Sequence, residues 1–260
     1  MSRWRAAVCA TAVVAAVLPA GRDARAQERQ DPLGDLHHRH FESPQNFAVE
    51  LRFLPYSPDI DSDPAVHGSP YRSTFGSTGR LMVGLEFDWQ ALRIPHLGTL
   101  GPGIAVGYTK MNAQATFMME HLGTTTSGET TSLEIIPTYA VAVFRADVFW
   151  REAHVPVVPY AKVGLGYALW RASNTLGTSV STDGTHGTGG SFGTQLAAGI
   201  ALNLNPLDAY AAQNFDEAMG VNNTYVFGEV MRSDLSGLGF QSHALRVGES
   251  SWVLGLAIEF

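Results

Sequence analysis

The side chains best suited to catalysis lie close together near the C-terminal end of the sequence. Ser242 and His243 are adjacent, and Glu249 follows a few residues later. A serine, a histidine and an acid can act as a nucleophilic set when the base reaches the hydroxyl and the acid orients the base. Adjacent residues on a strand point to opposite faces, which opposes joint action by Ser242 and His243. We therefore expect polar loop residues here, and a chain that is not an enzyme.

Metal and phosphate chemistry have less support. His37, His38 and His40 lie close enough in sequence to bind a metal ion weakly, but no carboxylate or cysteine completes a set at the spacing of known sites. The pair of glycines around Leu165 lies inside a strand pattern and lacks the following helix that a phosphate-binding loop needs. We expect no metal ligands, no catalytic residues and no cofactor.

Residues 1–26 have the organisation of a secretory signal peptide. Arg3 and Arg5 precede the apolar run 6–20, which is too short to span a membrane, and residues 24–26 supply the small side chains of a cleavage site. Cleavage after Ala26 would remove Cys9, the only cysteine, so no disulfide is expected in the exported chain. Residues 27–45 are polar and are expected to form a flexible periplasmic leader.

The charge balance argues against a nucleic-acid partner. Removal of residues 1–26 lowers Lys plus Arg from 17 to 13 and Asp plus Glu from 24 to 23, so the formal charge changes from −7 to −10. A protein that binds phosphate backbones needs a basic surface.

Eight segments alternate large apolar residues with small or charged ones, which is the period of a β-strand. They are 47–54, 80–89, 103–111, 131–144, 157–170, 191–204, 224–232 and 251–260. In segment 131–144 the pattern assigns Leu133, Ile135, Tyr139, Val141 and Val143 to the outer face, and Glu134, Thr138, Ala140 and Ala142 to the inner face. Pro137 in the same segment predicts a bulge or irregular pairing. The facing of segment 224–232 is ambiguous around Glu229.

Strands of about 9–11 residues with one large apolar face can cross a membrane if they close into a barrel. The predicted fold class is all-β: an eight-stranded antiparallel up-and-down transmembrane β-barrel over residues 46–260. An even strand number places both ends of the barrel on one side, the periplasm. The long connections 55–79, 112–130, 171–190 and 233–250 then face outside. One short periplasmic helix is expected at 208–219, ending at Gly220.

Charged residues on the small-residue faces would point into a narrow lumen. The expected lumen charge network is Glu50, Arg52, Glu86, Asp88, Glu134, Lys162 and Glu259. Acids outnumber bases in this set, and an unpaired buried charge is costly. Arg52 and Lys162 are therefore each expected to be shared by more than one carboxylate. Side chains can fill the lumen of a barrel of this size, so we expect no conductance.

Three stretches carry a resemblance to known proteins: FAVELR at 47–52, GVNNTYVF at 220–227 and WVLGLAIEF at 252–260. The chain resembles small outer-membrane β-barrels of the OmpA/OmpX-like class, and more narrowly an uncharacterised family known mainly from myxobacteria. The resemblance implies the outer membrane of a Gram-negative bacterium, with membrane lipid and the barrel-assembly machinery as partners. It makes alternate residues of the last strand an assembly signal, namely Trp252, Leu254, Leu256, Ile258 and Phe260.

The resemblance carries no known activity with it. The expected role is structural, or surface interaction with an unidentified extracellular ligand. The alternatives are a lipid A-modifying hydrolase of the same fold, using Ser242, His243 and Glu249, and a small pore.

Overall fold

The computed structural model describes residues 45–260, apart from 65, 120–122, 176, 181–183, 185 and 240–243. For the side chains of 115–119 and 123–128 it provides no description. The predicted signal peptide, and His37, His38 and His40 in the predicted leader, lie outside the described residues. So do Ser242 and His243.

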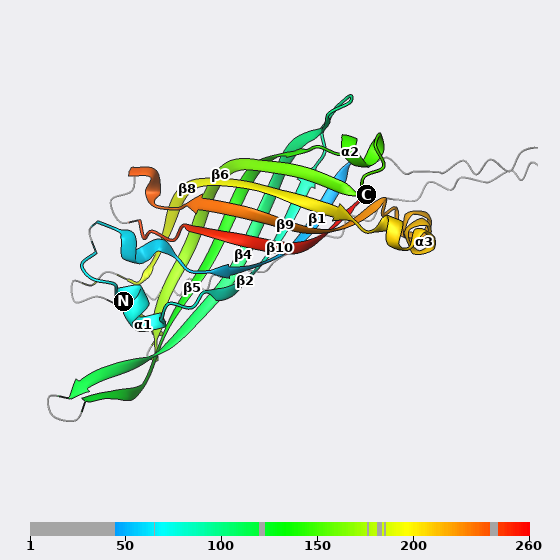
Figure 1. Cartoon of the computed structure of the whole chain (residues 1–260). Helices are drawn as coiled ribbons and strands as arrows, with labels where there is room; N and C mark the ends of the chain where they lie inside the picture. Colours follow the sequence, from blue (N-terminus) through cyan, green and yellow to red (C-terminus); the bar gives the residue numbers. More distant parts are fainter. Residues whose placement is uncertain are drawn as a thin grey trace, which may run out of the picture. The chain divides into compact units, whose positions relative to one another are not determined.

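Eight long strands of the described chain form a closed antiparallel ring (Figure 1). They are β1 (Phe47–Tyr56), β2 (Arg80–Trp89), β4 (Gly98–Met119), β5 (Gly123–Arg145), β6 (Val157–Asn174), β8 (Thr188–Asn203), β9 (Asn223–Asp234) and β10 (Glu249–Glu259). Each pairs with the next along the chain, and β1 pairs with β10, with Val49 opposite Ile258. Two short strands, β3 (Leu92–Ile94) and β7 (Gly177–Thr178), pair with β4 and β6. The predicted eight-stranded barrel is confirmed.

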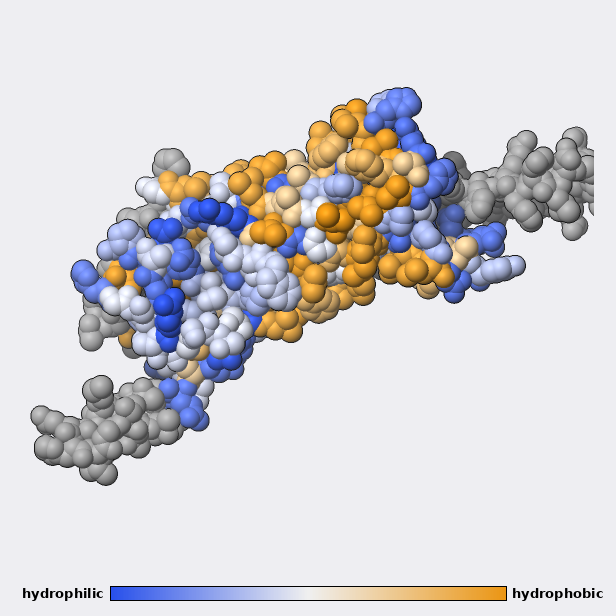
Figure 2. All heavy atoms as spheres, viewed as in Figure 1, coloured by the Kyte–Doolittle hydropathy of each residue, from blue (hydrophilic) through white to orange (hydrophobic). Residues whose placement is uncertain are grey.

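The strands expose large apolar side chains on the outside of the barrel and bury the alternate residues. In β10, Trp252, Leu254, Leu256 and Ile258 are exposed, while Val253, Ala257 and Glu259 are buried. The same alternation holds along β2, where Leu85 and Phe87 point outward and Glu86 inward. Figure 2 shows the resulting apolar surface over the middle of the barrel, with hydrophilic residues toward the end that carries α1 (Pro70–Phe75). Exposing an apolar surface of this extent to water is unfavourable, whereas the hydrocarbon core of a bilayer can accommodate it.

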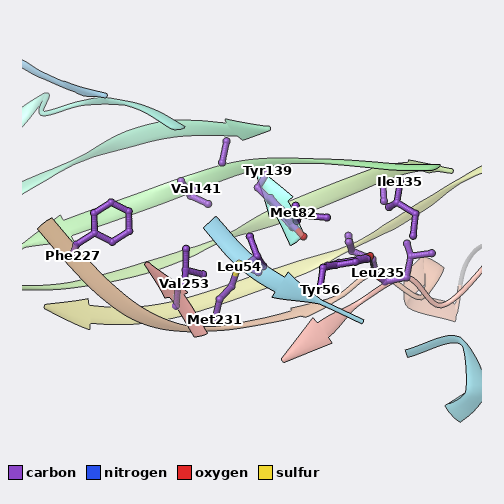
Figure 3. Close-up of a cluster of buried hydrophobic side chains, with 14 of the residues drawn as sticks. Leu54, Tyr56, Met82, Ile135, Tyr139, Val141, Phe227, Met231, Leu235 and Val253 are labelled. Atoms are coloured by element: carbon purple, nitrogen blue, oxygen red, sulfur yellow. Dashed lines mark hydrogen bonds between the residues drawn. The ribbon is translucent and has the colours of Figure 1, made fainter. Parts of the chain in front are cut away.

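Strand β5 faces the opposite way from the prediction. Leu133, Ile135, Tyr139, Val141 and Val143 are buried inside the barrel, so Glu134, Thr138, Ala140 and Ala142 point outward. The reason is that part of the lumen is an apolar core, in which these side chains meet Leu54, Tyr56, Met82 and Leu235 (Figure 3). The assumption that large apolar residues always face lipid was therefore wrong for this strand.

Pro137 causes no bulge, but the pairing of β4 with β5 is interrupted beside it, since neither Ile136 nor Pro137 has a recorded partner in β4. The pairing of β4 with β5 has the same register on both sides of it, with Val106 opposite Thr138 and Thr109 opposite Ile135. The recorded register shift lies further along, between Gln114 and Thr116. Gly107 provides room for the proline, because a Cβ at this position would lie 3.2 Å from the Pro137 ring and 2.9 Å from Met82.

The stretch 112–130, predicted as a loop, is largely strand. Asn112 pairs with Ser132 and Met119 pairs with Gly123, so β4 and β5 continue as a hairpin past the other strands (Figure 1). We call this end of the barrel the hairpin end. The first connection contains η1 (Asp59–Ser62) and α1, which place the buried Ile60 and Tyr71 in the mouth of the barrel.

The opposite end, where β1 begins and β10 finishes, is the terminal end. The predicted helix is present there as α3 (Ala209–Met219), and Asp208 accepts a hydrogen bond from the backbone N–H of Ala211. Gly220 ends the helix in the left-handed conformation at φ 69°. A further short helix, α2 (Val148–Arg151), follows β5. Among the described residues no helix is long and apolar enough to cross a membrane.

Candidate functional site in the barrel lumen

The inner face of the barrel carries a layer of buried charges near its middle, which we call the charge layer. Strand alternation points each of them inward: Glu50 and Arg52 from β1, Glu86 and Asp88 from β2, Arg145 from β5, Lys162 from β6 and Glu229 from β9. Glu50 and Glu86 lie directly opposite each other in the pairing of β1 with β2. Like charges in that position repel, so cations must lie between them.

Lys162 and Arg52 supply that positive charge. The Lys162 ammonium lies 2.7 Å from Glu50, 2.6 Å from Glu86 and 3.6 Å from Glu229. The Arg52 guanidinium donates to both Glu86 and Glu229 and lies 3.7 Å from Glu50. Each cation is therefore shared by several carboxylates.

Arg145 extends the layer toward the terminal end. Its guanidinium lies 2.5 Å from Glu50 and 2.6 Å from Asp88. Arg145 was missed from the sequence because the predicted strand ended at residue 144, which left Arg145 in the following connection, whereas β5 includes it. Counting back from Arg145 in steps of two would have placed the apolar side chains of β5 in the lumen as well.

Glu229 was the other residue missed, since the facing of its segment was ambiguous. Besides Arg52 and Lys162, it accepts a hydrogen bond of 3.0 Å from the Tyr160 hydroxyl. The Tyr160 ring lies 5.1 Å from the Lys162 ammonium and 5.6 Å from the Arg145 guanidinium. An aromatic face at this distance attracts a cation, so Tyr160 supports the two bases as well as the acid.

Glu259 lies apart from this layer, at the terminal end. It accepts hydrogen bonds from neutral groups: 2.7 Å from the Gln90 amide, 2.7 Å from the Tyr225 hydroxyl and 3.4 Å from the Asn223 amide. The Gln45 amide also donates to it. Buried carboxylates can be held by such donors in place of a cation.

Glu134 does not belong to the lumen, contrary to expectation. It points outward from β5 and pairs with Lys110 of β4 at 2.7 Å, with 43% of the Lys110 side chain and 29% of the Glu134 side chain exposed. The reversed facing of β5 is the reason. Glu249, the acid of the proposed hydrolase set, is buried at the hairpin end and accepts a hydrogen bond of 2.8 Å from the Ser57 backbone.

The charge layer fills the lumen with charges that pair with one another. Among the described residues it holds the acids Glu50, Glu86, Asp88 and Glu229 and the bases Arg52, Arg145 and Lys162, one more acid than base. Glu50, Glu86 and Asp88 could each offer an oxygen to one metal ion, with those oxygens within 4.8 Å of one another. Lys162 and Arg145 already occupy the space beside these oxygens, so a metal ion would have to compete with them.

The residues of the predicted assembly signal lie on the outside of the last strand. Trp252, Leu254, Leu256 and Ile258 are exposed along β10. The Phe260 ring lies 6.0 Å from that of Phe47. The backbone of Phe260 also exchanges hydrogen bonds of 3.0 and 2.8 Å with Phe47, which closes the seam between the first and last strands.

Comparisons with known proteins give fold neighbours only. No family model matches the chain, and neither does any curated protein. Ail, the attachment invasion locus protein of Yersinia pestis, solved in complex with the heparin analogue sucrose octasulfate, is 12% identical over 83% of this chain and 97% of its own, with a TM-score of 0.36. The N-terminal β-barrel domain of OprF from Pseudomonas aeruginosa is 10% identical over 84% and 100%, with a TM-score of 0.39. The E. coli outer membrane protein W is 13% identical over 83% and 98%, with a TM-score of 0.41. The chain's own strand pairing establishes the barrel.

Proposed function

We propose that this chain is an outer-membrane β-barrel of a Gram-negative bacterium with a structural or surface-interaction role, and that it neither catalyses a reaction nor conducts ions. The observation that carries the proposal is the division between the two faces of the barrel. Large apolar side chains cover the outside, and paired charges with an apolar core fill the inside. The first suits lipid, and the second argues against a water-filled channel.

Successive groups of side chains fill the lumen along its length. The charge layer is followed by Leu54, Met82, Tyr139 and Met231, around a cavity of about 20 Å³, room for roughly one water molecule. Ile60 and Tyr71 then close the mouth at the hairpin end, and the Tyr71 hydroxyl lies 3.1 Å from the Met111 sulfur. An ion would have to displace polar and apolar contacts in turn.

Planar-bilayer recording tests the absence of conductance. We expect a quiet baseline from purified, folded protein, because the charge layer and the apolar core fill the lumen. A porin reconstituted in the same bilayer provides the positive control. Stable ohmic steps of nanosiemens size would overturn the proposal and favour the small pore.

A surface-interaction role draws its support from the hairpin end. The β4–β5 hairpin continues beyond the barrel and is rich in threonine, and the edge of such a hairpin can pair with an extended partner. We place this end outside the cell and the terminal end in the periplasm. The narrower relationship to a myxobacterial family is part of the same proposal and rests on the three stretches that carry the resemblance.

The hydrolase alternative has its own test. Lipid A from cells with and without the protein would be compared by mass spectrometry. An acyl-chain difference that disappears in a Ser242→Ala variant would make the chain an enzyme.

A further inference from the structure

Helix α3 exposes most of its large apolar side chains. Tyr210 is 83% exposed, Met219 71% and Phe215 51%, and Leu207 in the preceding turn η2 (Asn205–Leu207) is 82% exposed. A surface helix of a globular protein instead turns such residues toward a core. The less exposed positions of α3 are the small or polar Ala211, Ala212 and Asp216.

The ends of α3 are held firmly at the rim of the barrel. The Asn205 amide donates to the Asn222 carbonyl at 2.7 Å and to the Asn223 side chain at 3.3 Å. The Asn205 backbone N–H donates to the Asn203 side chain at 2.8 Å. These contacts join the segment before α3 to the strand that follows it, so the position of the helix is defined.

The exposed side of α3 continues the apolar outside of the barrel. Leu202 at the end of β8 and Val226 at the start of β9 both point outward and are exposed. They precede and follow the α3 segment in the chain and lie opposite each other in the sheet. Figure 1 places α3 at the terminal end, beside the ends of these strands.

We infer that α3 is an interfacial helix, which inserts Phe215 and Met219, one turn apart on the same side of the helix, at the boundary between the headgroups and acyl chains of the membrane leaflet at the terminal end. The inference rests on the proposed membrane location of the barrel. A helix with one apolar and one charged side lies in the plane of the interface, buried by roughly 5–10 Å.

The charged residues around α3 indicate which lipid headgroups the helix would contact. Residues 208–219 contain Asp208, Asp216 and Glu217 and no lysine, arginine or histidine. Anionic headgroups would repel these carboxylates. The surface therefore fits a zwitterionic phospholipid such as phosphatidylethanolamine.

Site-directed spin labelling of the full chain tests the inference. In a background with Cys9 replaced, which leaves no other cysteine, single variants Phe215→Cys, Gln213→Cys and Val106→Cys place a label on the apolar side of α3, on its polar side and on the barrel exterior. Each variant is checked for folding by its heat-modifiable gel mobility. In phosphatidylethanolamine–phosphatidylcholine vesicles, the ratio of oxygen to nickel-chelate accessibility should be several-fold higher at 215 than at 213, and highest at 106.

The outcomes separate the inference from the proposed function. If the label at 106 is in lipid while those at 213 and 215 are equally aqueous, α3 is not interfacial, but the barrel remains a membrane protein. If all are aqueous, the membrane location fails as well. Adding phosphatidylglycerol should move the label at 215 toward water, and an unchanged depth would overturn the lipid preference. A label at 215 that is aqueous in vesicles but shielded in native envelopes would assign this surface to a protein partner and contradict the inference.

Discussion

At the scale of single residues, the lumen is held by cations that are each shared among several acids. Arg52 and Lys162 arise from strands that are not neighbours, β1 and β6, yet both contact Glu86 and Glu229. The planar Arg52 guanidinium can donate in two directions at once, whereas the Lys162 ammonium acts as a compact point charge. Removal of either base leaves acids close together without enough positive charge.

The first prediction concerns Arg52→Ala. The substitution should lower the free energy of unfolding by about 3–5 kcal/mol, because it leaves Glu86 and Glu229 buried with less compensation. Urea titration in lipid vesicles would measure the change. Glu50→Ala should be milder, since it brings the acids and bases of the charge layer to equal numbers.

Lys110→Ala is the matched control for Arg52→Ala. It also removes a base from an ion pair, but one that is exposed on the outside of β4, so its effect should be far smaller. Equal effects of the two substitutions would contradict a special role for the buried charges.

Two glycines on facing strands differ in the space around them. A Cβ at Gly255, on the inner face of β10, would lie 2.3 Å from the Leu51 carbonyl oxygen and 2.4 Å from the Phe227 ring. A Cβ at Gly228, on the outer face of β9, would meet only the Leu254 side chain at 3.4 Å. Gly255→Ala should therefore destabilise the barrel by about 1–3 kcal/mol through overpacking. Gly228→Ala, its control, should unfold at nearly the wild-type urea concentration, and a larger loss at 228 than at 255 would refute this account.

At the scale of elements, each strand turns inward the side chains that pack with those of the other strands at the same depth of the lumen. Strand β1 brings charge at Glu50 and Arg52 and apolar surface at Leu54, while β5 brings mainly apolar side chains and finishes on Arg145. The two kinds of strand together give the lumen its charge layer and its apolar core. Closure of β1 on β10 leaves no free edge in the ring, which protects the barrel from pairing with other chains.

The last strand allows a prediction about assembly. Deletion of Phe260 should leave the protein periplasmic or degraded, because the terminal aromatic is the proposed signal to the assembly machinery. It would also remove the backbone bonds to Phe47. Immunoblots of membrane and periplasmic fractions would measure the distribution.

Phe260→Ala and Phe260→Tyr separate the two causes. Both retain the backbone bonds to Phe47, but only the tyrosine variant keeps an aromatic ring. If the ring is the signal, the alanine variant should resemble the deletion and the tyrosine variant the wild type. Normal membrane levels of the deletion variant would count against a terminal signal.

At the scale of the whole molecule, the barrel presents different chemistry to three environments. Apolar side chains face outward, charges and apolar residues fill the lumen, and the β4–β5 hairpin continues past the sheet at one end. The proposed outer-membrane location requires export from the cytoplasm. The arginines, short apolar run and small residues of positions 1–26 supply the expected route.

The corresponding prediction is cleavage after Ala26. The intact mass of the protein purified from membranes should correspond to residues 27–260. Replacement of Ala24 and Ala26 with bulky residues should slow processing, whereas Gln27→Glu should not. A membrane form that retains residues 1–26 would exclude a cleaved signal.

The sequence by itself determined the barrel and its helix. Alternation of large apolar with small residues requires strands that have one face in an apolar environment, and Asp208 and Gly220 mark the ends of α3. These signals are local, since strand period and helix caps act over a few residues. They are therefore readable without knowledge of the partners.

Tertiary structure alone decided which face of β5 points inward, that Glu134 lies outside, and that Arg145 and Glu229 join the charge layer. It also decided that residues 112–119 and 123–130 continue the sheet as a hairpin. Apolar side chains suit both lipid and a dry lumen, so hydrophobicity cannot choose between the two faces of a strand. The choice depends on which side chains the other strands bring to the same depth. Contacts such as that between Arg52 and Glu229, which are 177 residues apart in sequence, exist only once the ring has closed.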